Sequence, residues 1–170
     1  MSPKSGNETP GEDVMQLATA PNSWGVWHAK DTRQMPWNVF LDGVAEIGFQ
    51  RIEAGPFGYF PTDVNRLKDE LNRRRISVIA GQVHGNLHVP EAWTGLEQQT
   101  RAVGRLNAAL GGTYLLVIGG GSVNHVTNER LAPSELNAEQ WRVMVDAIER
   151  IARISRNDYG LRTIFHPTID

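Results

Sequence analysis

The sequence predicts a parallel α/β fold in which single helices separate consecutive strands. Short runs rich in β-branched and other apolar residues recur along the chain, for example at 76–83 and 113–118. The longer segments between them place apolar residues three or four positions apart, which is typical of amphipathic helices. Strands that alternate with single helices pair in parallel through right-handed crossovers.

About five strands and four helices are expected in order. The strands are expected at residues 15–20, 51–54, 76–83, 113–118 and 161–166. Four features are expected to start the helices between them: Pro36, a cap at Thr62, a capping box at Thr94–Glu97 and a cap at Asn137. In the last helix, which Gly160 ends, the expected buried stripe is Trp141, Val145, Ile148 and Ala152. Residues 1–14 are expected to form a disordered tail, so that 15–170 make up the folded part.

Two architectures satisfy this alternation. One is an open, doubly wound sheet of five strands, and the other is the first five units of an eight-fold barrel. A complete barrel typically needs about 250 residues, whereas this chain has 170. Length by itself therefore favours the open sheet.

Composition and charge exclude several classes of function. The chain has no cysteine, which excludes a thiol nucleophile and a thiolate metal site. Its net charge of -2 disfavours nucleic acid and anionic membranes as partners. No signal peptide is evident, and no apolar run approaches the roughly 20 residues of a membrane span. We therefore expect a soluble, cytoplasmic protein that binds neither nucleic acid nor a membrane.

Polar residues cluster where the predicted strands end. Glu53 ends the second strand, His84 and His88 follow the third, and His166 ends the fifth; Asn124 and His125 follow the fourth. The carboxyl ends of parallel strands line the active site in such folds. A carboxylate between Ile52 and Ala54 in a buried strand is costly unless it is paired, so Glu53 indicates a site. The alternatives are an ion pair of Glu53 with Arg51, and surface or capping roles for the histidines.

Aromatic residues are concentrated in the loops after the first two strands. They are Trp24, Trp27, Phe57, Tyr59 and Phe60. Aromatic faces pack on the C–H surfaces of sugars and cyclitols, which favours a polyol pocket. These side chains could equally close the top of the core or contact a partner chain.

Three segments together resemble one known family. They are Ala20-Pro-Asn-Ser-Trp-Gly-Val-Trp27, the stretch 40–48, and Glu53-Ala-Gly-Pro-Phe-Gly-Tyr-Phe-Pro-Thr-Asp63. The chain resembles the sugar phosphate isomerase/epimerase superfamily of xylose-isomerase-like TIM barrels, and most of all its myo-inosose-2 dehydratase branch. The likeness is dense over about residues 17–82 and returns at Thr163-Ile-Phe-His-Pro167.

The resemblance implies an incomplete parallel (β/α)8 TIM barrel and an isomerase, epimerase or inosose-type dehydratase. It implies catalytic roles for Glu53 and His166, with His166 also a metal ligand. The other residues implied to bind the sugar or cyclitol substrate are Trp24, Trp27, Tyr59 and His84. A divalent metal (manganese, cobalt or magnesium) is implied for the complete fold. In that reading it would stabilise an enediolate.

Two departures from the family pattern bear on these expectations. The family's His-Pro-His is here His166-Pro167-Thr168, and the chain ends before strands six to eight, so we expect a truncated barrel. The alternative is a non-catalytic fragment that binds a small ligand or self-associates through the open barrel edge. A metal-dependent abasic-site nuclease shares the fold, but the acidic charge balance disfavours it.

Overall fold

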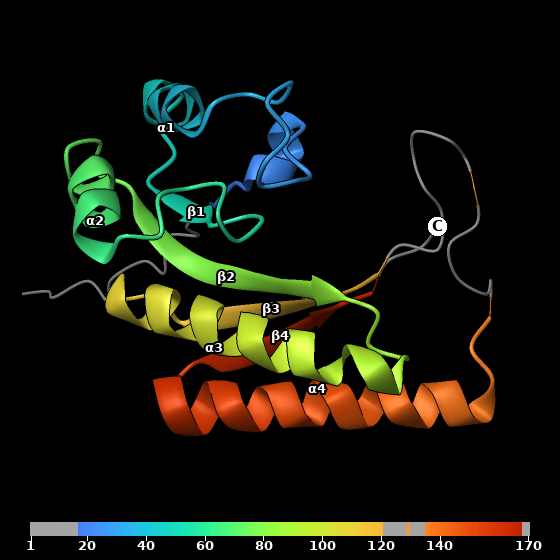
Figure 1. The fold of residues 1–170 in the computed structure, drawn as a ribbon. Helices are drawn as coiled ribbons and strands as arrows, with labels where there is room; N and C mark the ends of the chain where they lie inside the picture. Colours follow the sequence, from blue (N-terminus) through green and yellow to red (C-terminus); the bar gives the residue numbers. More distant parts are fainter. Residues whose placement is uncertain (1–16, 121–128, 130–134, 168–170) are drawn as a thin grey trace, which may run out of the picture.

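A computed structural model describes residues 17–120, 129 and 135–167. Within these residues the chain forms one parallel four-stranded sheet in the order β1-β2-β3-β4, with four α-helices (Figure 1). The parallel α/β class predicted from the sequence is confirmed. The expected tail 1–14 and the candidate residues Asn124 and His125 lie outside the described residues.

The elements follow one another as the hydrophobic pattern predicts. The strands are β1 (Arg51–Glu53), β2 (Ser77–Gly85), β3 (Tyr114–Gly119) and β4 (Arg162–His166). The helices are α1 (Trp37–Glu46), α2 (Val64–Asn72), α3 (Trp93–Ala109) and α4 (Ala138–Tyr159), with short 3-10 helices η1 (Pro21–Trp24) and η2 (Pro90–Ala92). Helices α3 and α4 lie side by side along the sheet (Figure 1).

The prediction of a strand at residues 15–20 is wrong for residues 17–20, the part of it that the structure describes. There it is a single bridge between Thr19 and Ile52. The Thr19 N–H donates to the Arg51 carbonyl at 3.2 Å, and the Glu53 N–H donates to the Thr19 carbonyl at 2.9 Å. The chain then enters η1 at Pro21, whose ring cannot donate to a ladder, so the pairing ends.

A register shift between β1 and β2 decides which side chains share a face. Ile52 pairs with Val78, whereas the next residue, Glu53, pairs with Ala80. Strand β2 therefore has one extra residue, Ile79, at this point, which is the geometry of a β-bulge. Because alternation along a strand has a period of two, the extra residue places the even-numbered residues that follow in β2 on the same face as Glu53.

Two apolar clusters fill the space between the strands and the helices. The first lies between β1, α1 and α2 and centres on Phe40, Leu41, Val44, Ile52, Leu67 and Leu71. The second lies between β2, β3, α3 and α4 and includes Val83, Leu96, Val103, Leu115, Val117 and Ile151. Both clusters hold the outer layer of helices onto one face of the sheet.

The predicted helix starts are partly correct. Asn137 caps α4 as expected, in a reciprocal capping box with Gln140, and Gly160 ends that helix in the left-handed conformation. The cap expected at Thr62 is wrong, since the side chain of Asp63 accepts the bond from the Arg66 N–H. The capping box expected at Thr94–Glu97 is also wrong. Helix α3 begins at Trp93, directly after η2, and its N-cap residue makes no side-chain bond.

The buried stripe predicted for α4 is rotated around the helix relative to the observed one. Trp141 and Val145 are exposed, at 57% and 39% of their surface. The buried residues of α4 are Met144, Ala147, Ile151 and Ser155. The Ser155 hydroxyl is satisfied within the helix by donating to the Ile151 carbonyl at 2.8 Å. The prediction is therefore wrong for Trp141 and Val145, whereas Ile148 of the predicted stripe is partly buried and packs against the second cluster.

No helix in the described ranges combines the length and apolar character that crossing a membrane requires.

Candidate active site at the carboxyl ends of the strands

Glu53, Gln82 and His84 lie on the sheet face that points away from the helices. The opposite face of β2 packs on α3, because a Cβ placed on Gly81 would lie 2.6 Å from Cγ1 of Val103. Side chains alternate along a strand, so Gln82 and His84 point away from α3. Glu53 joins them through its pairing with β2. In a closed barrel this face is the interior.

His166 comes to the same face from the far strand of the sheet. Ile118 of β3 pairs with His84 on one side and with His166 on the other, so the two histidines stand in one row across three strands. Glu53, His84 and His166 all lie at or near the carboxyl ends of their strands. The structure therefore brings together three of the residues that the sequence singled out, from segments more than 100 positions apart.

Glu53 and His166 are close enough to influence each other electrostatically. The Glu53 side chain is half-buried, and this burial raises the pKa of its carboxyl group above the ordinary 4.5. The positive charge of His166 acts in the opposite direction and lowers the pKa in part. Among the described residues Glu53 has no salt-bridge partner, so the alternative ion pair with Arg51 is not formed.

His84 stands at the exposed rim of this face. Its backbone N–H donates to the side-chain oxygen of Gln99 of α3 at 3.0 Å, which holds the end of β2 against the helix. The imidazole of His84 is solvent-accessible, as is that of His166. Both can therefore be reached by a molecule that approaches the carboxyl ends of the strands.

Two of the aromatic residues expected to bind substrate, Trp24 and Tyr59, pack within the protein. Trp24 packs edge-on against Phe40 at 5.5 Å between ring centroids, and its indole N–H donates to the Thr19 hydroxyl at 3.2 Å. Tyr59 is buried against Phe40 and donates its hydroxyl to the Met35 carbonyl at 2.8 Å. Burial raises the pKa of Tyr59 to about 12, so this donor stays protonated.

The other aromatic side chains of these loops are more accessible. Trp27 is 63% exposed and Phe57 is 36% exposed, whereas Phe60 is buried. Of the aromatic residues expected to bind substrate, Trp27 is thus the one with a free face. Trp24 and Tyr59 already use their polar atoms within the protein.

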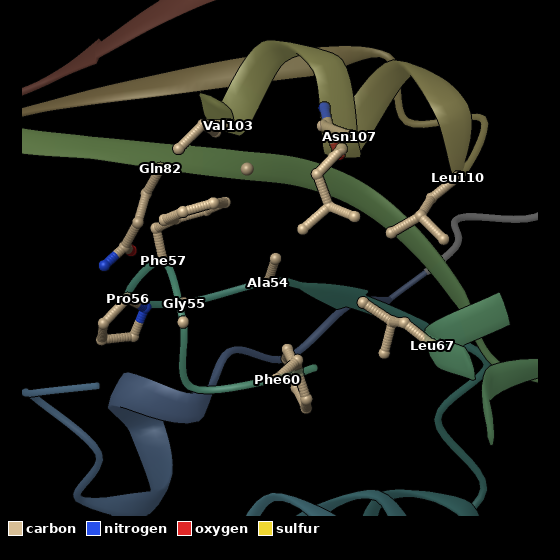
Figure 2. Close-up of a pocket in the computed structure, with 13 residues that line it drawn as sticks. Ala54, Gly55, Pro56, Phe57, Phe60, Leu67, Gln82, Val103, Asn107 and Leu110 are labelled. Carbon is tan, nitrogen blue, oxygen red and sulfur yellow. The ribbon is translucent and has the colours of Figure 1, made fainter. Parts of the chain in front are cut away.

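Gln82 is a buried polar residue that the sequence analysis missed. It is 7% exposed, and its Oε1 atom is buried without a hydrogen-bond partner among the residues that the structure describes. Gln82 lines a small cavity of about 20 Å³ beneath the loop that follows β1 (Figure 2). The other lining residues include Ala54, Gly55, Pro56, Phe57, Phe60, Leu67, Val103, Asn107 and Leu110. A polar residue within a largely apolar strand was the available signal.

The residues that the structure describes do not make a complete metal site. Nowhere in these ranges do three or more histidine, aspartate or glutamate side chains gather closely enough to hold an ion. His166 and Glu53 supply two donors of the kinds that divalent metals accept, but a catalytic site normally needs at least three protein ligands. The implied divalent metal therefore does not fit the described donor set.

The raised pKa of Glu53 predicts how stability depends on pH. Because the folded state binds the Glu53 proton more tightly than the unfolded state, the stability contributed by this group is fully present below about pH 4.5 and is lost as the pH rises through the folded-state pKa. Glu53→Gln removes this pH-dependent loss of stability, because glutamine does not ionise. We expect the variant to melt at a higher temperature than the wild type at about pH 8, and the difference to close at about pH 4. Thermal melts at the two pH values measure this, and an equal difference at both would contradict it.

Comparison with known proteins places this arrangement within one class of fold. No family model matches the chain, and no curated protein matches it. Solved structures do match, and those similar to it include xylose isomerase-like TIM barrels. The chain therefore has the α/β fold of part of a TIM barrel, similar to that of the xylose isomerase-like proteins, and the open sheet favoured by length is wrong.

Three solved structures illustrate the likeness. A xylose isomerase-like TIM barrel protein from Mycobacterium smegmatis in complex with magnesium has a TM-score of 0.66 at 11% identity, covering 88% of this chain and 54% of that one. The IolI protein with a bound zinc atom has 0.65 at 14%, covering 91% and 52%. D-psicose 3-epimerase with D-tagatose from Clostridium cellulolyticum H10 has 0.61 at 14%, covering 88% and 51%. The chain thus spans about half the length of these structures.

Proposed function

We propose that this chain is part of an isomerase, epimerase or inosose-type dehydratase that acts on a sugar or cyclitol. The observation that carries the proposal is the pair of Glu53 and His166, which come from opposite edges of the sheet to one face at its carboxyl ends. The fold supports it, because residues at the ends of barrel strands carry the chemistry in such folds. One of the similar structures is a D-psicose 3-epimerase with D-tagatose, which supports a polyol substrate.

Proton transfer at a carbon next to a carbonyl group is the step that these two residues suit. The Glu53 carboxylate would take the proton from that carbon, and its raised pKa makes it the stronger base for the purpose. The C–H electron pair forms the enediolate double bond, and the carbonyl electron pair moves to oxygen, to which the His166 imidazole would donate a hydrogen bond. Isomerisation follows when the proton returns to the former carbonyl carbon, the neighbouring hydroxyl loses its proton to become the new carbonyl, and the oxyanion takes up a proton. Epimerisation follows when a proton returns to the original carbon on its opposite face. Dehydration follows when the hydroxyl on the next carbon leaves with a proton as water while the enediolate collapses to a carbonyl.

Solvent-deuterium exchange tests this proposal directly. The protein would be incubated in D₂O with D-tagatose, D-fructose or an inosose, with added Mn²⁺, Co²⁺ or Mg²⁺ and, in a parallel sample, with EDTA. We expect deuterium to enter the carbons next to the carbonyl faster than in protein-free controls, as measured by NMR. No exchange above background with any of the three substrates and any of the three metals would contradict the proposal.

A second candidate is a non-catalytic protein that binds a small ligand or self-associates through β4. The apolar side chains of Ile164 and Phe165 on this edge strand are 44% and 38% exposed, which supports it. Sedimentation velocity separates the two candidates when it is run beside the exchange assay. A dimer without exchange favours the second, and exchange by a monomer favours the first.

A further inference from the structure

We infer that α4 is the contact surface for a second copy of this chain, which packs against it with the two helices antiparallel. The helix carries an apolar stripe that the sheet covers only in part. Its members recur three or four positions apart on one side of the helix: Trp141, Val145, Ile148 and Ala152. The sequence pattern predicted this stripe as core, yet Trp141 and Val145 are 57% and 39% exposed. The contact needs no substrate, so it goes beyond the proposed function.

The exposed end of the stripe lies on a part of α4 that extends past α3. The guanidinium of Arg150 lies over the ring of Trp93, the first residue of α3, at 3.6 Å from the ring centroid. Farther along both helices Arg101 pairs with Asp158 at 2.8 Å, so the two helices run in the same direction. The turns of α4 before Arg150 therefore extend beyond the start of α3 (Figure 1). Trp141 belongs to these turns.

An antiparallel pair of these helices fits large side chains against small ones. Helices that meet along stripes of this spacing interlock their side chains in layers. A two-fold axis that places Val145 beside Ile148 of the second copy also places Trp141 beside Ala152 of that copy, because both pairs are centred on the same point of the helix. Each indole then packs over an alanine. A parallel pair would instead bring the two Trp141 rings against each other.

The charges beside the stripe favour the same arrangement, and they identify a second copy as the partner. Arg142 and Glu149 are exposed, and each follows a member of the stripe by one position. About the same axis Arg142 comes next to Glu149 of the second copy, and exposed Glu135 comes next to Arg156 of that copy. By symmetry each pairing occurs twice. Arg142 also pairs with Glu139 in its own helix, but that pair is exposed and holds it weakly.

Sedimentation velocity from micromolar to millimolar protein tests the dimer. We expect a monomer–dimer equilibrium, and we expect Trp141→Ala to raise its dissociation constant by about a hundredfold or more, because each dimer loses two buried indole contacts. The melting temperature of the dilute, monomeric protein should change little, since Trp141 is exposed there. Trp27→Ala is the matched control, because Trp27 is 63% exposed in the loop before α1, and it should leave the dissociation constant unchanged.

Charge reversal tests the antiparallel orientation. Arg142→Glu and Glu149→Arg should each raise the dissociation constant by about tenfold, because like charges then meet twice in the dimer. The double variant restores opposite charges across the contact and should return the dissociation constant to that of the wild type. An effect confined to one helix would not be restored in this way, since both substitutions are still present.

Three results would overturn the inference. The first is a monomer at every concentration. The second is a dimer that Trp141→Ala leaves intact and that Ile164→Lys, on the edge strand β4, dissociates. The third is a dimer that neither charge reversal weakens, which would contradict the antiparallel pairing. An absence of deuterium exchange counts against the proposed function alone, because α4 lies on the opposite side of the sheet from the face that carries Glu53.

Discussion

Glu53→Gln is expected to slow solvent-deuterium exchange into the substrate by about 10²- to 10⁴-fold, the range that a positioned general base contributes. Glutamine keeps the shape of the side chain but cannot take a proton. The group it replaces is half-buried at the end of β1, where burial raises the pKa of the carboxyl. Exchange rates measured by NMR at saturating substrate test the expectation.

A charge-matched control isolates the chemical effect. Glu46→Gln removes one carboxylate from the exposed end of α1 and should leave the exchange rate within about twofold of wild type. Loss of folding does not account for the slower rate if Glu53→Gln melts at a higher temperature than wild type at about pH 8, as expected above. Exchange that continues at the wild-type rate in Glu53→Gln would remove this residue from the mechanism.

Phe40→Ala is expected to lower the free energy of unfolding by about 3–5 kcal/mol. The Phe40 ring is fully buried in α1 and contacts three other aromatic rings, those of Trp24, Tyr59 and Phe60, with centroids 5.5 to 6.3 Å away. Its removal leaves a cavity that these rigid rings cannot close, and the loss of the aromatic contacts adds to the cost. Urea unfolding followed by circular dichroism measures the change.

Val39→Ala provides the control for Phe40→Ala in the same turn of the helix. Val39 is 47% exposed, so its truncation should cost within about 0.5 kcal/mol. Equal destabilisation by the two substitutions would show that the aromatic cluster does not support the loops after β1.

The alternation of strands and helices could be predicted because it depends on local patterns. Strands β2 and β3 and helix α4 stand within two residues of their predicted limits, since apolar runs and helical spacing are properties of neighbouring residues. The buried face of α4 could not be predicted in the same way. Whether Trp141 or Ile151 faces the sheet depends on how closely the helix approaches it, which only the packing of the other elements sets.

The position of the candidate site could be predicted from the sequence, but not all of its residues could. Glu53, His84 and His166 were identified because polar residues at strand ends gather at one edge of a parallel sheet. Gln82 was missed although a polar residue within a largely apolar strand is a local signal, because only the strand pairing shows which face its side chain takes. Trp24 and Tyr59 were expected to meet the substrate, yet each uses its polar atom in a hydrogen bond within the protein.

The sequence by itself determined the class of fold, the order of its elements and the strand ends at which a site would form. These features could be predicted because hydrophobic periodicity, turn residues and a charged residue in an apolar run are each patterns of a few neighbouring residues. Only the tertiary structure decided that Glu53, Gln82, His84 and His166 share one face. The decisive feature is the extra residue of β2 opposite the step from Ile52 to Glu53. Side chains alternate between the two faces of a strand, so one inserted residue moves all the following side chains to the opposite face. The pairing register of two distant segments cannot be seen in the sequence of either segment alone.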